Sequence, residues 1–183
     1  MNMIELLSWF QTNYPHLQKA LKECTHHFNN QNLNPYHIEG DCWSHTLLVC
    51  KIAELREYDI VVKVSALFHD IGKPKARRVN SKNNHVSFYG HEKISAEMSK
   101  PLLEDLKKRG VLTQKESDIV LELVASHSYL YKHTKDEIYN RFKDNKTLFK
   151  YLWELSQCDN LGRFSNSMRE SESNYKSLIK VFE

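Results

Sequence analysis

The chain has 183 residues, 40% of them hydrophobic and 27% charged, which is the composition of one ordinary globular domain and excludes a disordered or fibrous protein. A formal charge of +3 is too small to indicate the basic surface of a dedicated duplex-binding protein. With only 5 glycines and 4 prolines the chain has little room for tight hairpins, so a mainly helical fold is expected.

The first half of the chain shows helical spacing of its apolar residues. Helices are predicted over about residues 3–14, from Pro15 to about Phe28, from near Ser44, and over 60–71, where Gly72 and Pro74 stop the last one. Residues 75–89 are polar and predict a loop, or one small irregular hairpin near residues 77–88. No larger sheet is indicated.

In the second half, a helix is expected from about His91, broken or restarted at Pro101. Two further helix starts carry the capping-box pattern, Thr113 with Glu116 and Thr134 with Glu137, and a later helix has its apolar stripe over 148–155. The chain is therefore predicted to be an all-α bundle, one domain over residues 1–183.

The ends of the chain and its cysteines give weaker indications. The first ten residues lack a basic n-region, and no apolar run approaches the ~18 residues of a membrane span, so we expect a cytoplasmic protein without a membrane partner. No C-x-x-C pair is present, which predicts four reduced core thiols. These are Cys24, Cys42, Cys50 and Cys158.

Several polar residues continue the apolar stripes of these helices. His45 precedes Leu48 by three positions, His127 follows Leu123 by four, and Asp159 follows Leu155 by four. A single inward histidine is more often a hydrogen-bonded core residue than a metal ligand. The pair His69-Asp70 is by itself weak evidence for a metal site, because so short a pair occurs by chance in many proteins. An unpaired buried charge would be very costly. Imidazoles and carboxylates that converge compensate one another if they surround cations, so a metal site is the economical interpretation.

The other histidines do not share this placement. Surface roles are expected for them, with His37 left open as a residue that lines the site entrance. They are His16, His26, His27, His85 and His133.

The order H…HD…H…H…D resembles that of the HD-domain phosphohydrolases. Three strings, HIEGDCWSH at 37–45, ALFHDIGKP at 66–74 and FYGHEKISA at 88–96, look like the HD domain of bacterial tRNA CCA-adding nucleotidyltransferases. The resemblance covers about residues 35–163, as a stand-alone domain without a nucleotidyltransferase head.

The resemblance implies a fold and a ligand set. It implies an all-α HD bundle in which His45, His69, Asp70 and Asp159 bind one divalent metal. His91 and His127 bind either a second ion, bridged by Asp70, or substrate phosphate. One or two ions are therefore expected, chosen from Mn, Ni, Co, Fe, Mg and Zn.

Phosphoester hydrolysis needs a nucleophile and stabilisation of phosphoryl charge. Asp70 is the predicted residue that helps remove the proton of a metal-bound water. Lys73 is either the catalytic or phosphate-binding cation or, equally, a solvated lysine at a helix end. Arg77, Arg78 and Arg163 are predicted to bind substrate, although a solvated basic loop explains the first two equally well. Phe88 and Tyr89 either stack a base or, more often for such residues, pack against the core.

The predicted function is divalent-metal-dependent hydrolysis of phosphate esters of nucleotides or RNA ends, of the 2′,3′-cyclic phosphodiesterase or 2′-phosphatase kind. A di-iron oxygenase on the HD fold, a nucleotidase or a nucleoside triphosphohydrolase are the alternatives. The expected partner is the phosphorylated nucleotide or RNA end, and oligomeric state is left open.

Overall fold

The computed structural model describes residues 1–29 and 33–165, so residues 166–183 of the expected domain lie outside the described residues. The helices are α1 Met3–Asn13, α2 Pro15–Glu23, α3 Cys42–Leu55, α4 Ile60–Phe68, α5 Lys73–Ala76, α6 His91–Lys108, α7 Gln114–Ser126, α8 Tyr129–Lys132, α9 Lys135–Phe142 and α10 Lys146–Leu161. The strands β1 Arg78–Asn80 and β2 His85–Ser87 pair antiparallel, with Val79 opposite Val86. The fold is all-α with one small hairpin, as the sequence predicts.

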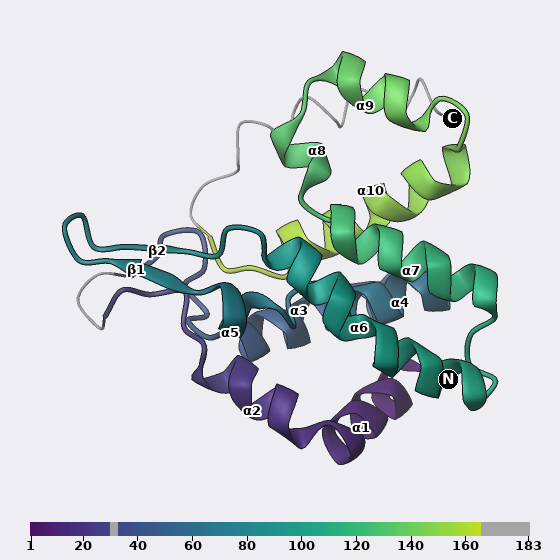
Figure 1. The fold of residues 1–183 in the computed structure, drawn as a ribbon, viewed down its shortest axis with the longest axis horizontal. Coiled ribbons are helices and arrows are strands. Elements are labelled where there is room, and N and C mark those ends of the chain that lie inside the picture. Colours follow the sequence, from purple (N-terminus) through teal and green to yellow (C-terminus); the bar gives the residue numbers. More distant parts are fainter. Residues whose placement is uncertain (30–32, 166–183) are drawn as a thin grey trace.

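The helices are arranged in three groups along the bundle. α1 and α2 lie at one end, α8 and α9 at the other, and α3, α4, α6 and α7 between them, while the hairpin projects from one side (Figure 1). The core runs through the middle group and includes the stacked rings of Phe10 and Trp43, whose centroids are 5.9 Å apart. Among the described residues, no helix is both long and apolar enough to cross a bilayer.

Capping explains where several helices begin. Thr113 accepts from the Glu116 backbone at the start of α7, and Thr134 does the same with Glu137 at α9, so both predicted capping boxes are present. Asp41 caps α3 through the Ser44 N–H.

Three predicted helix boundaries are wrong. α4 ends at Phe68 instead of Ile71, and Pro74, expected to stop it, lies in the first turn of α5, where its missing N–H is not needed. α6 continues through Pro101, because the lost hydrogen bond is offset by packing of its buried leucines against α7. α2 ends at Glu23 instead of reaching Phe28, because Thr25 forms a bridge with Asp41 and the chain turns into an extended segment. This segment brings residues 24–26 beside residues 40–42.

Glycines let two pairs of segments approach closely. A Cβ on Gly72 would lie 2.5 Å from the Ser95 backbone nitrogen in α6, and a Cβ on Gly162 would lie 2.7 Å from the Val49 nitrogen in α3. Real Cβ contacts are not this short, so only glycine fits at either place. The first contact brings the turn after α4 against α6, and the second brings the end of α10 against α3.

The described cysteines are all free and buried, as the sequence predicts.

Candidate metal centre

The six predicted metal ligands come together where five helices meet. His45 lies in α3, His69 and Asp70 follow α4, His91 begins α6, His127 follows α7, and Asp159 lies in the last turn of α10. The close contact at Gly72 brings Asp70, two residues earlier, toward α6. The close contact at Gly162 brings Asp159, three residues earlier, toward α3. All six are buried or nearly so, with the Asp159 side chain 13% exposed.

Four of these ligands make up the first half of the centre. His45 Nε2 lies 3.4 Å from His69 Nε2 and 3.0 Å from Asp159 Oδ1. Asp70 Oδ2 lies 3.2 Å from His69 Nε2 and 3.7 Å from His45 Nε2. The donor atoms of His45, His69 and Asp70 lie within 4.8 Å of one another, as a metal site requires, and Asp159 adjoins them through His45.

The second half uses the other oxygen of the same carboxylate. His91 Nε2 lies 3.0 Å from His127 Nε2 and 3.2 Å from Asp70 Oδ1, which is also 3.8 Å from His127 Nε2. Asp70 therefore stands between two ligand groups and presents one oxygen to each.

Three of the histidines are oriented by their own backbone. The Nδ1 atoms of His69, His91 and His127 each lie 2.8 Å from the carbonyl oxygen of the residue three positions earlier, to which they donate. In the neutral ring this leaves the Nε2 lone pair facing the centre. Burial lowers the pKa of His127 to about 3, so its ring is neutral. Two imidazole lone pairs 3.0 Å apart repel, and a cation between them removes the repulsion.

His45 is oriented by a carboxylate that the sequence analysis did not single out. Its Nδ1 lies 3.0 Å from Glu39 Oε1, which also accepts from His37 Nδ1 at 2.9 Å. Burial opposes the charged ring of His45, but Asp159 and Glu39 outweigh it and raise the pKa of His45 to about 9. The position of Glu39 inside the 37–45 string was the only signal for it.

Asp70 fits a shared ligand because its carboxylate is buried and unsatisfied. Among the described residues no hydrogen bond of good geometry reaches either oxygen, and Lys73 Nζ pairs with Oδ2 at 2.7 Å. Burial alone would raise the pKa of Asp70, but His69 and Lys73 hold it well below its usual range. A buried carboxylate with open lone pairs is a site that a cation satisfies.

Lys73 is itself held in place. Burial would lower the pKa of its ammonium, but Asp70 outweighs this and raises it. Its Nζ lies 3.0 Å from His26 Nε2, while His26 Nδ1 faces the Gly40 carbonyl at 3.2 Å. The Lys73 ammonium is therefore held beside Asp70, and its predicted catalytic or phosphate-binding role requires a position near the metal ligands.

The expected surface position of His26 is wrong. It is 2% exposed and its ring stacks on His37 at a centroid distance of 4.1 Å. The reason is the early end of α2, which the local pattern does not reveal. His26, His37 and Glu39 also form a group of possible ligands, but these residues already have partners: His26 Nε2 contacts Lys73 Nζ at 3.0 Å, and His37 Nδ1 pairs with Glu39 Oε1.

Two of the predicted substrate-binding arginines are held by backbone carbonyls. Arg77 donates to the carbonyl oxygens of Thr25 and His27 at 2.9 and 3.0 Å, and Arg78 donates to carbonyls of its own turn. Arg163 is buried and donates to the side chain of Asn160, the residue after Asp159, at 2.6 Å. Substrate binding by these three side chains stays a prediction.

A pocket of about 360 Å³ opens beside the centre. Lys73, His91 and His37 lie among its lining residues, together with Phe88 and Tyr89 from the end of the hairpin. Phe88 packs against the core, whereas Tyr89 is 95% exposed.

The chain is similar to curated proteins over part of their length. It is 32% identical over 97 residues to the multifunctional CCA protein of Burkholderia orbicola, which is 53% of this chain and 22% of that protein. It is 29% identical over 157 residues to the multifunctional CCA protein of Methylobacillus flagellatus, 86% of this chain and 34% of that protein. The chain thus spans between 22% and 34% of the length of these relatives.

The family model of the HD domain matches residues 42–164, the stretch that contains all six ligands. Members of this family are generally metal-dependent hydrolases. The described fold, the His/Asp clusters that can hold a metal, and this match agree with one another, and the chain belongs to the HD domain family.

Proposed function

We propose that the protein is a divalent-metal-dependent phosphohydrolase that acts on phosphate esters of nucleotides or RNA ends, as a 2′,3′-cyclic phosphodiesterase or 2′-phosphatase. The observation that carries the proposal is the carboxylate of Asp70, which presents one oxygen to each of two histidine groups. The proposal assigns two ions to these groups, with Asp70 shared.

The residues of the chain would divide the work as follows. A bound divalent ion supplies an acidified water and offsets charge on the phosphoryl oxygens. Glu39 orients His45, and the backbone carbonyls orient the other three imidazoles. Asp70 would hold both ions and so help the attacking water lose its proton, and Lys73 beside it would hold a non-bridging oxygen of the substrate.

The pocket beside the centre supports a nucleotide-sized substrate. Its volume of about 360 Å³ lies in the range of small-molecule sites. The buried ammonium of Lys73 at its wall favours an anionic group over neutral dioxygen, which supports phosphoester hydrolysis over the oxygenase alternative. The similarity to CCA proteins supports a substrate related to RNA ends.

The test is a substrate and metal screen. The protein is stripped with a chelator, reloaded separately with Mn²⁺, Fe²⁺, Ni²⁺, Co²⁺, Mg²⁺, Zn²⁺ or Ca²⁺, and assayed on p-nitrophenyl phosphate and on 2′,3′-cyclic, 2′-, 3′- and 5′-phosphorylated nucleotides. We expect hydrolysis of a cyclic or 2′-phosphorylated substrate and two bound ions per chain.

Two results would contradict the proposal. If the protein cleaves no phosphate ester with any metal, the phosphohydrolase assignment is wrong. If the iron-loaded protein takes up dioxygen, the assignment changes to the oxygenase.

A further inference from the structure

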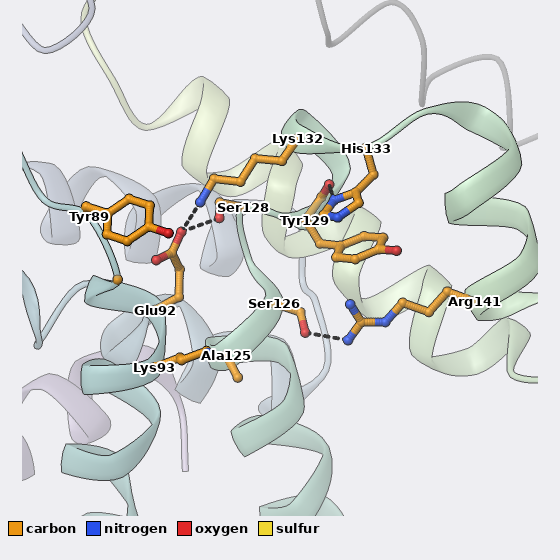
Figure 2. Close-up of a pocket in the computed structure, with 11 residues that line it drawn as sticks. Tyr89, Glu92, Lys93, Ala125, Ser126, Ser128, Tyr129, Lys132, His133 and Arg141 are labelled. Carbon is orange, nitrogen blue, oxygen red and sulfur yellow. Dashed lines mark hydrogen bonds and ion pairs between the residues drawn. The ribbon is translucent and has the colours of Figure 1, made fainter.

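A second pocket lies next to the one that reaches the metal ligands. It has a volume of about 280 Å³ and is formed by the start of α6, the end of α7, α8 and Arg141 of α9 (Figure 2). Tyr89, Glu92 and Lys132 line both pockets, so the two are neighbours. The Glu92 carboxylate, bonded to Ser128 and Lys132, forms the ridge between them.

Tyr89 stands at the junction of the two pockets with its ring in solvent. It is 95% exposed, the most exposed of the large hydrophobic side chains described, while its neighbour Phe88 packs on the core. The backbone after it is held by Gly90, whose φ of 79° turns the chain directly into His91. A solvent-exposed ring between a metal ligand and a second pocket is suited to stacking a nucleobase.

The second pocket carries more positive than negative charge. Lys93 is exposed and has no ion pair among the described residues, and the Lys132 side chain is 57% exposed although it pairs with Glu92. Arg141 is held in position by an ion pair with Glu122. It also donates to the Ser126 hydroxyl at 2.8 Å (Figure 2). Three cations against two carboxylates leave donors available for an anion.

Arg141 also belongs to a rigid wall. Its guanidinium lies 4.1 Å from the centroid of the Tyr129 ring, whose other neighbour, His133, stacks at 3.6 Å. This wall is preorganised, so a ligand bound there does not have to order the side chains itself.

We propose that this second pocket binds the nucleotide next to the scissile phosphoryl group of a single-stranded oligoribonucleotide. The base stacks on Tyr89, and the adjoining phosphate lies over Lys93 and Lys132. The inference rests on the proposed function and narrows it: the substrate has at least two nucleotides, and the second pocket makes the contact beyond the scissile phosphoryl group.

The experiment measures binding and hydrolysis separately. Binding of a fluorescein-labelled short single-stranded RNA is followed by anisotropy in EDTA, so that no hydrolysis occurs. The variants are Tyr89→Ala, Tyr89→Phe and Lys93→Ala, with Lys115→Ala as the matched control, an exposed lysine at the other end of α7.

We expect Tyr89→Ala to weaken RNA binding about tenfold. Tyr89→Phe should bind RNA as tightly as the unmodified protein, because stacking needs the ring and not the hydroxyl. Lys93→Ala should weaken binding and reduce the slope of log Kd against log salt by about 0.7, the share of one phosphate on a single strand. Lys115→Ala should behave as the unmodified protein.

Hydrolysis distinguishes the two proposals. The ratio of kcat/KM for a dinucleotide to that for p-nitrophenyl phosphate should fall about tenfold in Tyr89→Ala. If p-nitrophenyl phosphate is cleaved but RNA affinity and this ratio stay the same in Tyr89→Ala and Lys93→Ala, the second pocket is not a nucleotide subsite and the phosphohydrolase assignment stands. If no ester is cleaved, the assignment fails independently of RNA binding.

Discussion

Asp70 carries more of the proposed centre than any other residue, because both ligand groups depend on its carboxylate. Asp70→Ala is expected to abolish metal-dependent hydrolysis and leave a helical protein, measured by activity assay and circular dichroism. The change also leaves the Lys73 ammonium buried without its partner, which costs about 3–5 kcal/mol. The double variant Asp70→Ala/Lys73→Met should therefore melt at a higher temperature than Asp70→Ala and remain inactive. An active Asp70→Ala enzyme would contradict the assignment.

Arg77 and Arg78 are adjacent in sequence but make different contacts. The Arg77 guanidinium fastens residues 25–27 to the segment after α5, whereas Arg78 reaches only its own turn. We expect Arg77→Ala to reduce the free energy of unfolding by about 2 kcal/mol, since two charged hydrogen bonds are lost, and Arg78→Ala to leave it unchanged. Urea unfolding of both variants is the measurement. If instead both variants raise KM for an oligonucleotide without a loss of stability, the pair binds substrate as the sequence predicted.

At the scale of helices, the close approach at Gly72 joins the turn after α4 to α6. Gly72→Ala would place a methyl group 2.5 Å from the Ser95 nitrogen, so α6 must move and His91 with it. We expect a loss of about 1–3 kcal/mol in stability and weaker Mn²⁺ binding, by urea unfolding and calorimetry.

Gly110→Ala is the control for the loss of a glycine. Gly110 has a φ of +70° and no atom within 4 Å of an added Cβ, so the substitution strains only the backbone, by about 1 kcal/mol. It should lower stability and leave Mn²⁺ affinity unchanged. Equal Mn²⁺ affinity in Gly72→Ala would show that the approach of α6 is not needed for the site.

The elements that the sequence predicts well are those determined by neighbours along the chain. Capping boxes and apolar periodicity predicted the starts of α7 and α9 and the inward direction of His45 and His127. The end of α2 could not be predicted, because it depends on a bridge between Thr25 and Asp41, sixteen positions apart.

The same limit applies to the site. The histidines and carboxylates of the HD pattern were identified, and the structure brings them together. Glu39 and His26 were not identified, since their contacts with His45 and Lys73 exist only after α2, α3 and the turn after α4 have packed. Local signals therefore predict ligands better than the residues that orient them.

For the whole molecule, metal binding should stabilise the bundle because the ligands come from five separate helices. An ion at 100 times its dissociation constant contributes about 2.7 kcal/mol, which for a chain of this size raises Tm by about 5–10 °C. Thermal melting with added Mn²⁺, Ni²⁺ or Co²⁺ should show this shift, and Ca²⁺ should produce less, because imidazole nitrogens outnumber carboxylates among the ligands. An equal shift with Ca²⁺, or none with any ion, would contradict the ligand set.

The bonds from His69, His91 and His127 to carbonyls three residues earlier mean that each of these ligands is aimed by its own turn of chain. His45 alone relies on a side chain from another segment, Glu39. A displacement of residues 37–41 would therefore release the orientation of one ligand and leave the His91–His127 group intact. The two halves of the centre are therefore held differently, and a movement of residues 37–41 would alter metal affinity through the half that contains His45.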